Sequence, residues 1–304
     1  MCCSLAPAEF SKTIVFAGEA KHGRKTVHVN GYQNTAQHLG HHRSPSIEML
    51  KRRFLGEVGA PKPAATEASG NAMIIPIPAK PRTMSPKNLV SSEDCPNILE
   101  NMAAAVRSLN RRETLSADSL IGAKLATRGV QIFEHDIYTV VLADDARKIP
   151  AALRRLPPSK RPPLNDEVFS AYAKWYPKWT VAVCCFTNEE AARAKPLLWW
   201  YEPMNRKQLF IPGLDSHTGG VPDLQGRAKR DHVMAVSSCS MTGGAAVRYG
   251  SRERLSTDAA LFMPPQVIGA EMRNEDPNCD WYCSVADVRK GTFHPLRLIP
   301  PGAR

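Results

Sequence analysis

The chain has 304 residues, of which 43% are hydrophobic and 23% are charged, so we expect most of it to fold, as one large domain or two small ones. Its 25 prolines favour many short elements over a helical bundle. The formal net charge of +11 favours binding to an anionic partner, such as nucleic acid, an acidic protein or a membrane surface.

No segment has the pattern of a secretory signal or a transmembrane helix. The longest apolar runs, IYTVVLA (137–143) and WTVAVCCF (179–186), are too short to cross a bilayer and are typical of buried strands. We therefore predict a soluble cytoplasmic protein. Its eight cysteines show no regular disulfide spacing, so we expect reduced thiols.

The first part of the chain predicts a hairpin followed by an insertion. The β-rich runs TIVFAGEA (13–20) and TVHVNGYQN (26–34) flank a polar, Gly-centred link. Residues 37–70 are rich in His, Pro, Ala and Gly, which indicates a flexible insertion. Within it, Lys51, Arg52 and Arg53 form a basic run, and we predict that this run binds the anionic partner.

The middle of the chain alternates strand and helix signals. NAMIIPIPA (71–79) is typical of an edge strand, and apolar spacing predicts a helix over 95–109. The two apolar runs named above are expected to be strands separated by helices over 145–156 and 166–176. LLWWYEP (197–203) and QLFIPGL (208–214) then read as two strands joined by a turn. This order predicts an α+β fold, with helices packed on a mixed or mostly antiparallel sheet.

The C-terminal third gives weaker signals. HVMAVSSCS (232–240) and AAVRYGS (245–251) predict a hairpin around a Gly-containing turn. Residues 252–304 show little pattern apart from a short strand at 281–285. The predicted organisation is listed by residue number: an N-terminal hairpin (1–36) joining the main sheet, the insertion (37–70), the main domain (71–251) and an irregular C-terminal segment (252–304).

Residues 70–215 resemble uncharacterised bacterial proteins of a domain-of-unknown-function kind. The resemblance rests on the order of NAMIIPIPA, YTVVLADDARKIPAAL, a helix, WTVAVCCF and PLLWWYEP. No activity is established for those proteins, so the resemblance implies a fold and no function.

The opening MCCSL raises the possibility of catalysis by Cys2. Removal of Met1 would give Cys2 a free α-amine that can accept the thiol proton, and the thiolate is the reactive form. This start resembles cysteine-type N-terminal-nucleophile hydrolases, which attack amides. Asn30 and Asn34 on the predicted hairpin are the candidate oxyanion donors. The chain departs from that family because it has no aspartate before Asp94.

Other chemistries have partial signals. Cys2 and Cys3 beside basic segments are compatible with lipidation. A metal would have as candidate ligands His38, His41 and His42 with Cys2 or Cys3, or Cys279, Cys283 and His294. Neither set has a complete metal-site spacing, and no P-loop, G-x-G-x-x-G, H-E-x-x-H or G-x-S-x-G sequence is present. We therefore predict no cofactor and no metal.

Two polar clusters follow strands, Glu134-His135-Asp136 and Asp215-Ser216-His217-Thr218-Gly219-Gly220. We interpret both as turn chemistry, in which the polar side chains bond to nearby backbone. Two functional hypotheses remain. The first is a non-catalytic interaction module with a basic surface that binds a protein or polyanion, and the second is a Cys2-dependent amidohydrolase.

Overall fold

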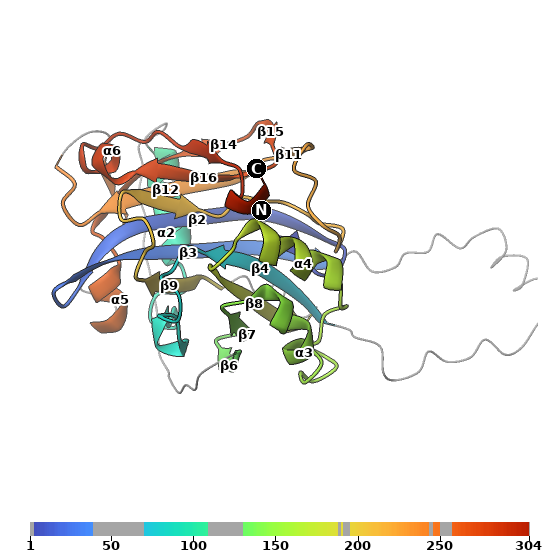
Figure 1. The fold of residues 1–304 in the computed structure, drawn as a ribbon. Helices are drawn as coiled ribbons and strands as arrows, with labels where there is room; N and C mark the ends of the chain where they lie inside the picture. Colours follow the sequence, from blue (N-terminus) through green and yellow to red (C-terminus); the bar gives the residue numbers. More distant parts are fainter. Residues whose placement is uncertain are drawn as a thin grey trace, which may run out of the picture.

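The computed structural model describes residues 3–38, 70–108, 130–187, 190, 195–242, 246–249 and 257–303. Within this part of the chain, two large β-sheets pack face to face with helices on their outer faces (Figure 1). The fold is therefore α+β and rich in strands, which confirms the predicted class. No described helix is both long and apolar enough to cross a membrane.

The larger sheet has seven strands and is antiparallel except where β12 lies parallel to β2. Its order is β13 (Val247–Arg248), β14 (Gln266–Met272), β12 (His232–Ser238), β2 (Ala8–His22), β3 (Lys25–His38), β9 (Leu197–Tyr201) and β5 (Leu89–Val90). β2 and β3 form the predicted hairpin, and Gly23 at φ 59° makes the turn.

The second sheet has five antiparallel strands. Its order is β1 (Cys3–Ser4), β4 (Gly70–Ile77), β8 (Thr180–Thr187), β7 (Tyr138–Ala143) and β6 (Gln131–His135). Two smaller antiparallel sheets complete the strands. They are β10 (Gln208–Ile211), β16 (Asp280–Ser284) and β17 (Leu296–Leu298), and the pair β11 (Arg227–Lys229) and β15 (Glu275–Pro277).

Helices cover the outer face of each large sheet. The five-stranded sheet is covered by α3 (Ile149–Leu153) and α4 (Asp166–Trp175), and the seven-stranded sheet by α2 (Ile98–Ser108) and α5 (Thr257–Phe262). The short elements α6 (Val285–Arg289), η1 (Pro86–Asn88) and η2 (Ala146–Lys148) lie at connections, and η5 (Pro301–Ala303) follows β17. Asn165 caps the N-terminus of α4, since its side chain accepts a hydrogen bond from the Glu167 N–H.

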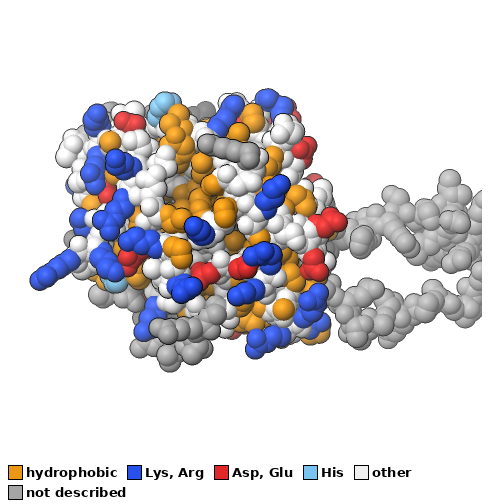
Figure 2. Space-filling view, in the orientation of Figure 1, with side chains coloured by type: hydrophobic (Ala, Val, Ile, Leu, Met, Phe, Trp, Pro, Cys, Tyr) orange, Lys and Arg blue, Asp and Glu red, His pale blue; other side chains and the backbone are white. Residues whose placement is uncertain are grey.

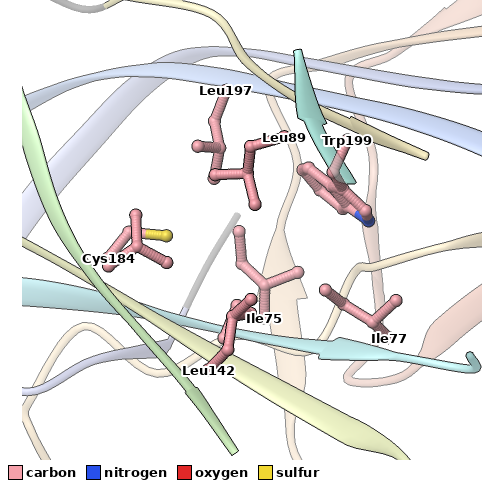
Figure 3. Close-up of a pocket in the computed structure, with 9 residues that line it drawn as sticks. Ile75, Ile77, Leu89, Leu142, Cys184, Leu197 and Trp199 are labelled. Carbon is pink, nitrogen blue, oxygen red and sulfur yellow. The ribbon is translucent and has the colours of Figure 1, made fainter. Parts of the chain in front are cut away.

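The core between the sheets is apolar and tightly filled. Figure 3 shows side chains from both large sheets pointing toward one another there, including Ile75, Leu142, Cys184, Leu197 and Trp199. The cavity that they leave has a volume of about 10 Å³, roughly the space of one water molecule. This region stabilises the fold and holds no room for a ligand.

Two predictions about strand pairing differ from the structure. β9 and β10 are strands, but β9 pairs with β3 and β5 while β10 pairs with β16, so they form no hairpin. β12 and β13 likewise pair with β14 and not with each other. Residues 257–298, which had little sequence pattern, contain α5, α6 and four strands. Three of these strands have five residues or fewer, and β14, β15 and β17 are only partly buried, which weakens the alternation of apolar and polar residues.

Candidate binding groove

A groove of about 590 Å³ opens beside the first residues of β2. One wall is β2, which contributes Glu9, Phe10, Ser11 and Thr13. The opposite wall is β11, and Asp231, which precedes β12, and His232, the first residue of β12, also line the groove. Asp215 and His217 reach it from the loop after β10. We call this feature the β2–β11 groove.

The groove exists because β12 joins β2 only from Ile14 onward. The β2–β3 register shifts between Ser11 and Ile14, and Lys12 has φ 55°. Bulges of this kind bend a strand and end its regular pairing. The Asp231 carboxylate accepts a hydrogen bond from the Lys12 N–H at 2.7 Å and so stabilises the bend. Before the bulge, Glu9 to Ser11 pair with β3 on one side and line the groove on the other.

A hydrogen-bonded loop places Asp215 and His217 in the groove. Asn278 accepts from the Asp215 N–H at 2.8 Å and donates to the Asp215 carbonyl at 2.7 Å. Fully buried Asp280 accepts from the N–H groups of Gly213 and Leu214 at 2.7 and 3.0 Å. Because these bonds fix the main chain on both sides of the turn, the lining of the groove is preorganised.

Asp280 also binds the helix layer. Its carboxylate accepts from the Tyr176 hydroxyl at 2.6 Å. Burial raises the pKa of Asp280, while these three hydrogen bonds and the charge of Arg230 oppose that rise. The buried Arg230 guanidinium donates to the carbonyls of Gly213 and Pro277 and stacks 4.3 Å above the Trp281 ring. The loop and β11 therefore share one buried polar network.

The two groove histidines are in different environments. His217 Nε2 lies 2.9 Å from Asp215 Oδ1, and its ring packs 5.1 Å from the ring of Phe10. His232 is buried, and its Nδ1 accepts from the Asp231 N–H at 3.0 Å. Burial lowers the pKa of His232 well below its usual value, so this imidazole is neutral near pH 7. Within the described part of the chain, no hydroxyl or thiol is hydrogen-bonded to His217.

The sequence-predicted site residues fall into two groups. Cys2, Lys51, Arg52 and Arg53 lie outside the described residues. Asn30 and Asn34 are buried in β3. The Asn30 amide donates to the carbonyls of Phe16 and Phe210 at 3.1 and 2.8 Å, and the Asn34 amide donates to the Tyr32 hydroxyl at 3.3 Å. Both side chains bond to the core, and their role as oxyanion donors stays a prediction.

The turn after β10 combines backbone bonding with a paired imidazole. Ser216 donates to the Gly220 carbonyl at 2.9 Å, and the Thr218 hydroxyl accepts from the Gly220 N–H. These bonds are the predicted turn chemistry. The Asp215–His217 pair was not expected, although residues two apart in an extended chain share a face. That D-x-H spacing was the available signal. No sequence pattern indicated that Phe10 or β11 would line the groove.

The metal candidates gain no support from geometry. Cys279 and Cys283 are buried, and burial raises the pKa of their thiols to about 11 and about 12, which favours the protonated form over a metal-binding thiolate. Among the described residues, no three His, Cys, Asp or Glu side chains are arranged to hold a metal ion. His38, His41 and His42 have no described side-chain positions.

Comparison with known proteins leaves the function open. No family model matches the chain, and no curated protein matches it. Two solved structures are similar. A mutated baculovirus P35 after caspase cleavage has 14% sequence identity and a TM-score of 0.40, and a caspase-8/P35 complex has 13% sequence identity and a TM-score of 0.39. Each match covers 77% of this chain, which spans 66% and 64% of theirs, slightly less than two thirds. At these scores neither bears on function.

Proposed function

We propose that this protein is a non-catalytic interaction module that binds a segment of a protein partner in the β2–β11 groove. The observation that carries the proposal is a preorganised groove of about 590 Å³, lined by aromatic, charged and hydrogen-bonding groups. That volume is within the range of ligand-binding clefts, and its mixed lining suits a polypeptide.

The distribution of charge favours a protein partner over a polyanion. Figure 2 shows Lys and Arg side chains spread across the visible face with Asp and Glu among them, and not gathered in one stripe. Several cations are already paired, for example Arg107 with Glu271 and Arg289 with Glu19. Polyanion binding usually depends on a continuous basic patch.

The test uses a phage-displayed library of random 12-residue peptides as the probe. Ser11 is exposed and lines the groove, so Ser11→Trp fills it, while Ser170→Trp on the exposed face of α4 is the matched control. Peptides selected on the wild-type protein should lose at least tenfold in affinity for Ser11→Trp and keep it for Ser170→Trp. Failure to select any peptide, or equal binding to both variants, would contradict the proposal.

A Cys2-dependent amidohydrolase is the second candidate, and one contact favours it. Cys3 forms a bridge with Ser216, the residue between Asp215 and His217. Cys3 is itself buried, and its thiol donates to the Leu214 carbonyl. Cys2 directly precedes Cys3 in the sequence. The proposed nucleophile is therefore followed by a strand, β1, that lies next to the Asp215–His217 carboxylate–imidazole pair.

Two measurements test this candidate. Intact mass should show loss of Met1, and a limiting dose of iodoacetamide near pH 7 should label Cys2 before the other thiols. Among the described cysteines, Cys239 is the exposed one, so the labelling is done in a Cys239→Ser variant. Retained Met1, or labelling of Cys2 no faster than that of Cys95, whose pKa burial raises to about 12, would exclude the nucleophile.

A further inference from the structure

We infer that the partner segment binds in the β2–β11 groove as a β-strand that hydrogen-bonds to both walls and joins the seven-stranded sheet to the β11–β15 pair. This inference rests on the proposed function and adds the form in which the partner binds. It follows from the direction of the main-chain groups along the two walls.

The β2 wall presents one main-chain position to the groove. In an antiparallel pair, alternate residues direct their N–H and C=O groups to the same side. Ala8 donates its N–H away from β3 to the His217 carbonyl at 3.1 Å, and Lys12 donates to Asp231. Phe10 lies between them with the same parity. Its N–H and C=O therefore point into the groove, where no described residue hydrogen-bonds to them.

The β11 wall presents two further main-chain positions to the groove. The Arg230 N–H donates to the Asn274 carbonyl, and the Asn278 N–H donates to the Gly226 carbonyl, so the even-numbered residues of this strand bond to β15. Arg227 and Lys229 consequently direct their main-chain groups to the other side. That side faces the groove, and Pro277 opposite Arg227 needs no N–H for the ladder.

Two free strand edges that face one groove are a template for strand addition. The walls also alternate in step: Phe10 and Ala228 are buried, whereas Glu9, Arg227 and Lys229 are exposed. An inserted strand would therefore place its inward side chains beside Phe10 and Ala228 and its outward ones beside Arg227 and Lys229. The outward side chains lie between Glu9 on one wall and Arg227 and Lys229 on the other, so the two cations outnumber the carboxylate. We assign as partner a short extended segment with apolar inward residues and acidic outward residues on the side of β11.

The experiment separates the strand mode from binding in general. A peptide selected as above is resynthesised with N-methyl groups on its central residues, which removes main-chain donors and keeps the side chains. In the protein, Lys229→Pro removes a groove-facing N–H that β15 does not use, and Lys229→Ala is the matched control. We expect the methylated peptide and Lys229→Pro each to lower affinity at least tenfold, and Lys229→Ala less than threefold.

Hydrogen exchange gives a second measurement on the unmodified chain, independent of whether Lys229→Pro folds. The bound peptide should slow exchange of the Phe10 and Lys229 amides. Unchanged exchange of these amides, together with full binding of the methylated peptide, would overturn the strand mode. If Ser11→Trp still lowered peptide affinity in that case, the groove would remain the binding site. A dimer of the chain that dissociates on peptide addition would assign the edges to a second copy and overturn the separate partner.

Discussion

The inter-sheet core and the β2–β11 groove are both spaces between strands, but they are bounded by opposite chemistry. The core cavity is lined by apolar side chains from both large sheets and is almost filled. The groove is lined by ionisable and hydrogen-bonding groups and has room for several residues. The same sheet thus contributes a closed face that stabilises the fold and, beyond one bulge, an open edge suited to binding.

The largest effect should come from removing the carboxylate that joins the groove loop to the helix layer. Asp280→Ala leaves two buried N–H groups and the Tyr176 hydroxyl without their acceptor, so we expect the free energy of unfolding to fall by about 3–5 kcal/mol. Urea denaturation measures it. The control Asp166→Ala removes an exposed carboxylate and should cost less than about 1 kcal/mol. Equal costs would show that Asp280 does not hold the loop.

Enlarging the core cavity should cost somewhat less. Ile75→Ala removes buried methyl groups beside a space that is almost filled, so we expect a loss of about 3 kcal/mol in the free energy of unfolding. Leu296→Ala, at an exposed position, should change it by less than about 1 kcal/mol. If the two variants were equally stable in urea, the core would not be close-packed.

Acid should destabilise the fold through the buried histidine of β3, His28. Burial lowers the pKa of His28 from 6.5 to about 4, so the unfolded chain binds a proton that the folded chain does not. Stability should therefore fall as the pH falls from about 6.5 to about 4, by about 2–3 kcal/mol from His28. Urea unfolding at pH 7 and pH 4.5 measures the change. His28→Phe, which keeps an aromatic ring, should lose less stability between these two pH values. An equal loss in this variant would show that His28 is not the cause.

The smallest change in stability should come from the groove itself. Ser11→Trp alters an exposed side chain at a strand edge, so we expect its free energy of unfolding to stay within about 0.5 kcal/mol of wild type. The same variant should lower the affinity for the selected peptides at least tenfold. Thermal unfolding followed by circular dichroism checks the first statement. A large loss of stability would mean that the groove is part of the core and not a binding edge.

Local sequence patterns predicted the elements that depend on local interactions. The β2–β3 hairpin, α2, α4, β7 and β8 all lie where apolar periodicity placed them. Strand partners were harder, because pairing is decided by contacts distant in the sequence. The strands β9 and β10 follow one another, yet each is paired with a remote strand, and β16 provides the partner for β10.

The groove could not be predicted for a related reason. It depends on the left-handed φ of Lys12, on a carboxylate that is distant in the sequence, and on which side the β11 amides face. None of these leaves a local pattern. Asp215 and His217 were recognised as a polar cluster, but their pairing across a two-residue step appeared only when the loop was fixed by Asn278 and Asp280.

One ion pair between residues that are far apart in the sequence affects the order in which the large sheet can fold. Glu19 in β2 is almost fully buried and bonds to Arg289 at the end of α6, 270 residues later, at 2.8 Å. The neighbour of β2 in the sheet, β12, is also synthesised late. During translation the centre of the first hairpin therefore stays uncovered until these later residues have been synthesised. The large sheet can therefore be completed only after β12 and α6 have been synthesised, because both contact β2.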